Sequence, residues 1–157
     1  MPRTFGDSNV HMSHFDKMVE CNDDLPLAHS AEPTDQESRI GQFIADNLVE
    51  DGATLQMGEK RALLVTTMSV VANLCCVMRI LGIGSIPNAV LRKLHDHRDL
   101  GVHTEMFSDG VIPLIKEGVI TNAQKVLHTG KLVSGFAYGS RDLYDFMDNN
   151  PLIGSTY

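Results

Sequence analysis

Short apolar segments with strand character alternate with helical segments through most of this chain, and this alternation limits the fold more than any other feature. Strand-like stretches occupy 53–58, 99–107 and 131–139, and helical stretches lie between and after them. Elements of these lengths in this order are typical of a parallel sheet with helical crossovers. The sequence therefore predicts an α/β fold built on an open parallel sheet.

The helix boundaries follow local signals. Thr34 and Glu37 form the T-x-x-E pattern of a capping box, and Gly52 fits the stop of the helix that follows. Pro87 fits the first turn of a helix running to Leu94. Further helices are expected from 108 to a stop at Gly118, with Asp109 and Gly110 as its cap, and from a Ser140 cap to just before Pro151.

Composition excludes several classes of protein. The 157 residues suffice for one domain, and a formal net charge of −7 disfavours a nucleic-acid partner, which needs a basic face. The three cysteines form no CxxC pair, so a disulfide framework is not expected. The histidine pairs 11/14 and 95/97 lack cysteines or carboxylates at zinc-like spacing, so no metal site is predicted.

One segment permits two interpretations. Residues 62–81 contain a single charge, Arg79, and are long enough to cross a bilayer as a helix, which would make the chain a small anchored protein. Thr66, Thr67, Ser69 and Asn73 lower its hydropathy, so a buried helix or strand is the alternative that we favour. The first 20 residues lack an apolar core, so they do not form a secretory signal.

Glu105 stands in an apolar, strand-like stretch, where burying an ionised carboxylate is costly. Either it caps the turn beside Ser108 and Asp109, or it is a functional carboxylate at the end of its strand. His103 shares its strand face and is expected to line any site there. Parallel strands end at one edge of a sheet, where sites of open α/β folds lie.

A glycine turn precedes Glu105 by about twenty residues. Gly82, Ile83, Gly84, Ser85, Ile86 and Pro87 fall between a strand-like segment and a helix. Backbone N–H groups at such a turn can hold a phosphate or a developing oxyanion, and a purely structural turn is equally consistent with the pattern.

Longer motifs carry a family resemblance. The stretches MPRTFGDS, DGATLQMG, GIGSIPNAVL, LGVHTEMFSDGV, GVITN and LYDFMDNNP follow one another in the order seen in the acetyl-CoA hydrolase/transferase family. The chain resembles the 4-hydroxybutyrate CoA-transferase branch of this family over nearly all its length, although it matches only part of a full-length member.

The resemblance implies a reaction and its residues. Members transfer coenzyme A from an acyl-CoA to a small carboxylic acid such as acetate, and water replaces the acid in the hydrolases. The glutamate of the H[ST]EM motif, matched by Glu105, attacks the acyl thioester to give an anhydride, and CoA thiolate then forms a glutamyl-CoA thioester. The GIGxIP loop, matched by Gly82–Pro87, contacts CoA and the oxyanion. The resemblance implies no metal, a homodimer or larger assembly, and a mitochondrial location. No targeting peptide is visible, so a cytoplasmic location is the alternative.

This chain departs from the family pattern at two places. The family runs from DGATLQMG directly into IGxIP, whereas 24 additional residues, 59–82, stand between them here. One hypothesis is a retained intron of 72 nucleotides, three for each residue, which sequencing of the transcript would refute by finding an uninterrupted exon.

The second departure concerns extent. Residues 1–33 match the tail of the family's N-terminal domain and a linker, and 34–157 match an incomplete C-terminal domain. We therefore expect a truncated sheet with little transferase activity by itself, and a catalytically inactive isoform that binds CoA or full-length subunits is the alternative.

Overall fold

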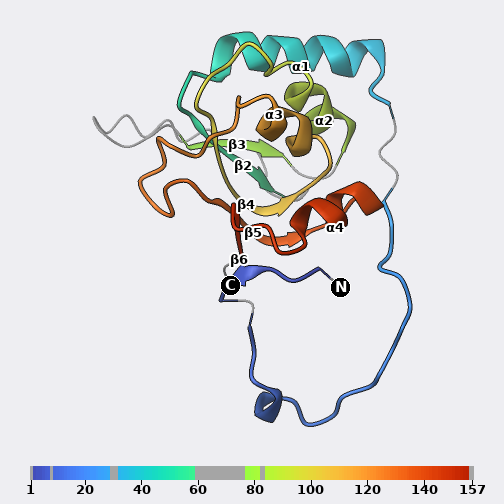
Figure 1. The fold of residues 1–157 in the computed structure, drawn as a ribbon. Coiled ribbons are helices and arrows are strands. Elements are labelled where there is room, and N and C mark those ends of the chain that lie inside the picture. The colour runs from blue at the N-terminus through green and yellow to red at the C-terminus, as the bar shows by residue number, and fades with distance from the viewer. Residues whose placement is uncertain (1, 8, 29–31, 59–76, 82–83, 156–157) are drawn as a thin grey trace.

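A six-stranded parallel sheet forms the centre of the molecule (Figure 1). The computed structural model describes residues 2–7, 9–28, 32–58, 77–81 and 84–155. The strands follow the spatial order β1-β6-β5-β4-β2-β3. Their bounds are β1 Phe5–Gly6, β2 Thr54–Gly58, β3 Val77–Leu81, β4 Gly101–Phe107, β5 Leu132–Ala137 and β6 Ile153–Ser155. The predicted α/β class and parallel sheet are confirmed.

The helices begin close to where the sequence predicts. They are α1 Asp35–Leu48, α2 Ser85–Leu91, α3 Val111–Lys116 and α4 Arg141–Met147, with a short 3₁₀ turn at Met12–His14. The capping box of α1 is confirmed, because Glu37 N–H donates to Thr34 Oγ1 at 3.3 Å and Thr34 N–H donates to Glu37 Oε2 at 2.8 Å.

Three helix ends differ from prediction. α4 ends at Met147, with Asp148 as its C-cap, instead of just before Pro151. α2 ends at Leu91 instead of Leu94, because Lys93 and Leu94 donate to carbonyls three residues back and so continue as tighter turns. α1 ends at Leu48, before Gly52, whose φ of +77° places it in the turn leading to β2.

All four helices contribute buried residues to one core on the same face of the sheet. The strand residues Leu55, Val102, Leu132 and Ile153 form one row across four strands, and each is at most 2% exposed. This row joins one core with buried residues of every helix, among them Ala45, Val90, Val111 and Leu143. Crossovers between parallel strands are right-handed, and the connections from β3 to β4, β5 and β6 move in one direction across the sheet, so α2, α3 and α4 lie on one side. The connection from β1 to β2 runs the opposite way, and its helix α1 packs on α2.

The side chains that alternate with this row point to the opposite face of the sheet. On β4 these include His103 and Glu105. Since each described helix contributes to the core on the first face, no helix from the described part of the chain covers the second. The sheet is therefore covered by helices on one side only within the described residues.

The edges of the sheet are occupied by short strands. β1 pairs in parallel with β6 through Phe5↔Gly154 and Gly6↔Ser155, and the arm that follows β1 runs away from the body and returns to α1 (Figure 1). At the other edge, β3 pairs residue for residue with β2.

The apolar run 62–81 is described only in part. Its last five residues form the strand β3, and its earlier residues lie outside the described ones. Among the described residues, no helix has the length and apolarity needed to cross a bilayer.

Gly41 tests the packing of α1 on α2. A Cβ at this position would lie 2.7 Å from the Ala89 carbonyl carbon, so the helices approach too closely for a methyl group. We expect Gly41→Ala to lower the free energy of unfolding by about 1–2 kcal/mol, because overpacking outweighs the better helix propensity of alanine. Urea denaturation measures this, and Arg39→Ala on the exposed face of α1 is the control. An unchanged or higher midpoint for Gly41→Ala would contradict the close contact.

Candidate active site on the open face of the sheet

Glu105 lies near the carboxyl end of β4, on the face away from the helices. Its neighbours Thr104 and Met106 are buried on the other face, whereas Glu105 is exposed. Within the described residues, the Glu105 carboxylate has no hydrogen-bond or ion-pair partner. Its backbone carbonyl accepts a 3.3 Å hydrogen bond from Ser134 Oγ of β5, which ties this part of β4 to the next strand. The arrangement presents an exposed carboxylate on a backbone that is bonded to the next strand.

The glycine turn leads into α2 at the same edge of the sheet. Gly84 is the extended residue before α2, Ser85 and Ile86 begin the helix, and Gly82 and Ile83 lie outside the described residues. Because β2 lies between β3 and β4, the turn and Glu105 follow strands that are not neighbours. Ser108 Oγ, just after β4, donates to Asn88 Oδ1 of α2 at 3.3 Å, so the two strand ends are connected at one edge.

Ser85 is held by a residue that sequence reasoning assigned only to a helix cap. Its hydroxyl donates to Glu37 Oε1, while the other carboxylate oxygen accepts from the N–H and hydroxyl of Thr34. The bond from Ser85, followed by those from Thr34, holds the pKa of Glu37 below its ordinary value. Glu37 therefore joins the first turn of α1 to the first turn of α2. The T-x-x-E spacing identified the cap, but nothing local indicated a partner 48 residues away.

The position of Asp109 predicted that it caps α3, but its side chain makes no capping hydrogen bond to this helix. Its carboxylate instead accepts from Ser140, from the backbone N–H at 3.1 Å and from the hydroxyl at 2.5 Å. Gly110 is the N-cap residue of α3, and Ser140 is that of α4. Asp109 thus links the loop after β4 to the loop after β5.

Lys125 is a buried cation near the amino end of the same face. Its side chain is only 5% exposed, and Nζ donates to the carbonyls of Val102 at 2.8 Å and Lys131 at 2.6 Å. Burial lowers the pKa of Lys125 from 10.5 to about 8. The imidazole of His103 lies edge-to-face against that of His128, with ring centroids 6.1 Å apart.

The environment of His103 favours its neutral form. Loss of hydration, followed by the nearby charge of Lys125 and then His128, lowers the pKa of His103. Sequence reasoning placed His103 beside Glu105 but missed Lys125 and His128, because the loop that carries them reaches β4 only in the folded chain.

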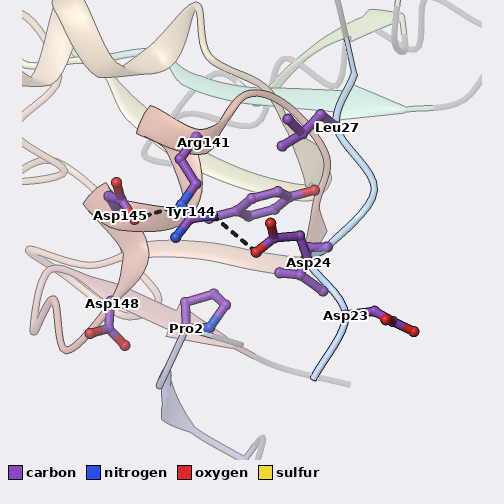
Figure 2. A pocket seen from close by; sticks show the side chains of 9 residues that line it. Pro2, Asp23, Asp24, Leu27, Arg141, Tyr144, Asp145 and Asp148 are labelled. Atoms are coloured by element: carbon purple, nitrogen blue, oxygen red, sulfur yellow. Dashed lines mark hydrogen bonds and ion pairs between the residues drawn. The ribbon is translucent and has the colours of Figure 1, made fainter. Parts of the chain in front are cut away.

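A pocket of about 270 Å³ lies elsewhere, between the amino-terminal arm and α4 (Figure 2). Arg141 crosses it to bond Asp24 at 3.1 Å, and Tyr144 donates to the carbonyl of Pro26 at 2.8 Å. None of the residues lining it is a predicted site residue. These contacts fasten the arm to α4.

Metal ligands do not gather in the part of the chain that the structure describes, where no group of three histidine, cysteine or acidic side chains could hold an ion. His95 instead pairs with Glu117, and His97 bonds the Val49 carbonyl at 3.0 Å.

Comparison with known proteins identifies relatives along nearly the whole chain. A succinyl-CoA:acetate/propanoyl-CoA:succinate CoA transferase from Fasciola hepatica is 44% identical over 153 residues, which cover 98% of this chain and 27% of that protein. A 4-hydroxybutyrate coenzyme A transferase from Clostridium kluyveri is 43% identical over 98% of this chain and 30% of its own length. The homologues of this chain are CoA-transferases. No family model matches the chain.

Solved structures of CoA-transferase relatives share the fold. A 4-hydroxybutyrate CoA-transferase from Porphyromonas gingivalis superimposes with a TM-score of 0.75 at 40% identity, covering 99% of this chain and 33% of that one. RipA from Yersinia pestis gives a TM-score of 0.77 at 34% identity, over 99% of this chain and 30% of its own. The resemblance found in the motifs is confirmed, and the chain spans less than a third of the length of these curated CoA-transferases.

Lys125 predicts a pH dependence of stability in this CoA-transferase homologue. Because its folded pKa of about 8 lies below 10.5, the unfolded chain binds more protons between these values. The free energy of unfolding therefore rises as pH increases from about 8 to 10.5, by at most about 3 kcal/mol from this residue.

Denaturant unfolding at several pH values measures the effect, and Lys125→Met serves as the reference because it retains the buried aliphatic chain without the charge. The difference between wild type and Lys125→Met should change across this window. A constant difference over the whole range would contradict the buried, uncompensated ammonium.

Proposed function

We propose that this chain carries the nucleophile of an acyl-CoA:carboxylate CoA-transferase acting on small acids of the acetate or 4-hydroxybutyrate type. The observation that supports this most is an exposed carboxylate, Glu105, fixed on a strand of a fold homologous to CoA-transferases and without a partner among the described residues. A carboxylate is already ionised at neutral pH, so it needs no partner base.

The proposed chemistry proceeds by exchange of bonds at two carbonyl carbons. A carboxylate oxygen of Glu105 attacks the acyl thioester, the C–S bond breaks, and an acyl-glutamyl anhydride forms with release of CoA thiolate. The thiolate then attacks the glutamyl carbonyl, displacing the first acid and leaving a glutamyl-CoA thioester. An acceptor carboxylate reverses both steps, so CoA moves to the new acid and Glu105 is regenerated.

The turn before α2 is proposed to serve CoA and the oxyanion. In this proposal, Gly82, Ile83, Gly84, Ser85 and Ile86 bind CoA, and two or three backbone N–H groups of the turn stabilise the oxyanion, each contributing on the order of 3 kcal/mol to barrier lowering. The contact between Glu37 and Ser85 supports a fixed loop, since it anchors the first turn of α2 to α1.

A second candidate function is non-catalytic: binding of CoA or association with full-length subunits. It is favoured by the exposed apolar side chains of α1, Ile40 at 45%, Phe43 at 66% and Leu48 at 58%, on a chain that spans less than a third of its relatives. Size-exclusion chromatography with a full-length CoA-transferase tests this, and separate elution would contradict association.

The covalent step gives the sharper test, because a single event per molecule suffices for detection. After incubation with acetyl-CoA, peptide mass spectrometry should find a CoA-mass adduct on the peptide that contains Glu105. Glu105→Gln should reduce the adduct at least about a thousandfold, whereas Glu50→Gln, an exposed carboxylate beyond α1, should leave it unchanged. An adduct that persists in Glu105→Gln would refute the assignment, and CoA binding without any adduct would favour the second candidate.

The two contacts of Glu37, one with Ser85 and one with Thr34, should affect CoA affinity differently. Glu37→Ala releases Ser85 and should weaken CoA binding by about tenfold, the effect of losing one hydrogen-bonded anchor. Thr34→Ala removes the cap but keeps the Ser85 contact, so its CoA affinity should stay within about twofold. Isothermal titration calorimetry with CoA measures both, and equal losses in the two variants would contradict a separate anchoring role.

A further inference from the structure

Lys125 places a positive charge where solvent hardly reaches it. Nζ bonds two backbone carbonyls, those of Val102 before His103 and of Lys131 before β5, and so connects the amino ends of β4 and β5. Its aliphatic chain lies against Gly101, where an added Cβ would come within 2.6 Å of Lys125 Cγ. In the described part of the chain, no carboxylate lies within ion-pair distance of the ammonium.

A buried ammonium without a carboxylate carries a desolvation cost that an apolar side chain of similar volume avoids. Connecting two strands does not require a charge, since an amide or hydroxyl can donate to a carbonyl as well. One consequence of this charge concerns His103, because the charge of Lys125 disfavours protonation of its imidazole.

The groups around His103 disfavour its protonation. The loop between α3 and β5 supplies Lys125 and the edge-to-face His128, and neither neighbouring strand, β2 or β5, has a titratable side chain. The remaining charged group on its own strand is Glu105, two residues along the same face. An imidazolium at that distance, about 7 Å along the strand, would attract the Glu105 carboxylate.

We propose that Lys125 is a positioning residue that adds to the effect of burial and keeps His103 uncharged beside Glu105, so that the carboxylate remains unpaired and nucleophilic under mildly acidic conditions. This inference rests on the proposed function for its link to catalysis, whereas the effect of Lys125 on His103 is independent of it. A protonated His103 would pair with Glu105 and withdraw electron density from the attacking oxygen. The role requires the charge of Lys125 and not only its hydrogen bonds.

NMR titration of the histidine imidazoles in the 157-residue chain tests the charge effect directly. Lys125→Met should move the titration midpoint of His103 to higher pH, because it removes the cation and keeps the apolar stem. Lys131→Met is the matched control, since it removes an exposed lysine of the same loop that bonds the Pro151 carbonyl. An unchanged His103 midpoint in a folded Lys125→Met variant would overturn the proposal.

Two further measurements keep the test decisive if Lys125→Met does not fold. Lys125→Gln retains a donor for a strand carbonyl without the charge and should produce the same rise in the midpoint. In the wild type, the His103 signal should show a second step near pH 8, where Lys125 loses its proton. Absence of that step would overturn the proposal.

The link to catalysis is read from the pH profile of the Glu105 adduct. In Lys125→Met, the yield should fall by at most about fourfold at pH 6, where an imidazole with the ordinary pKa of 6.5 is about one quarter neutral, and it should approach the wild-type value at pH 8.5. A purely structural role would lower the yield equally at every pH and would overturn the link. If the wild type forms no adduct at any pH, the proposed function fails together with the link, and the titration of His103 still decides the effect of Lys125.

Discussion

The handedness of the strand connections separates packing from chemistry in this chain. Because right-handed crossovers carry α2, α3 and α4 to one side, Leu55, Val102, Leu132 and Ile153 form the base of the core, and the residues between them face away from it. The period of two along β4 then fixes Glu105 on the open face. A register slip of one residue would exchange it with Met106 and bury the carboxylate.

Polar contacts between loops fix the carboxyl edge of the sheet. Glu37 holds Ser85, and Asp109 holds Ser140, so a carboxylate from another element holds the first residue of α2 and the N-cap residue of α4. These contacts position the first turn of each helix, although neither helix has a side-chain hydrogen bond from its own N-cap residue. Ser85 and Ser140 are thus positioned by contacts within the chain, and groups positioned in advance are a condition for catalysis by backbone groups.

Local signals in the sequence predicted most of the fold, and long-range contacts account for what they missed. Alternation and capping residues located β2, β4, β5 and all four helices, because those signals act within a few residues. The motif also singled out Glu105. The partners Glu37–Ser85 and Lys125–His103 are separated by 48 and 22 residues, so no spacing rule connects them. The role of Asp109 was wrong because Ser140 competes for its carboxylate.

The amino-terminal arm has a consequence for how the chain folds. Arg3 N–H bonds Asp148 across 145 positions, and β1 adds to β6 at the far side of the sheet. Closing so long a loop costs conformational entropy, and the two residues of β1 and a few polar contacts offset only part of this cost. β1 also has no strand to pair with until β6 has formed. The arm is thus the last element to dock and the first to detach, and a protease would cut there while the remainder stays folded.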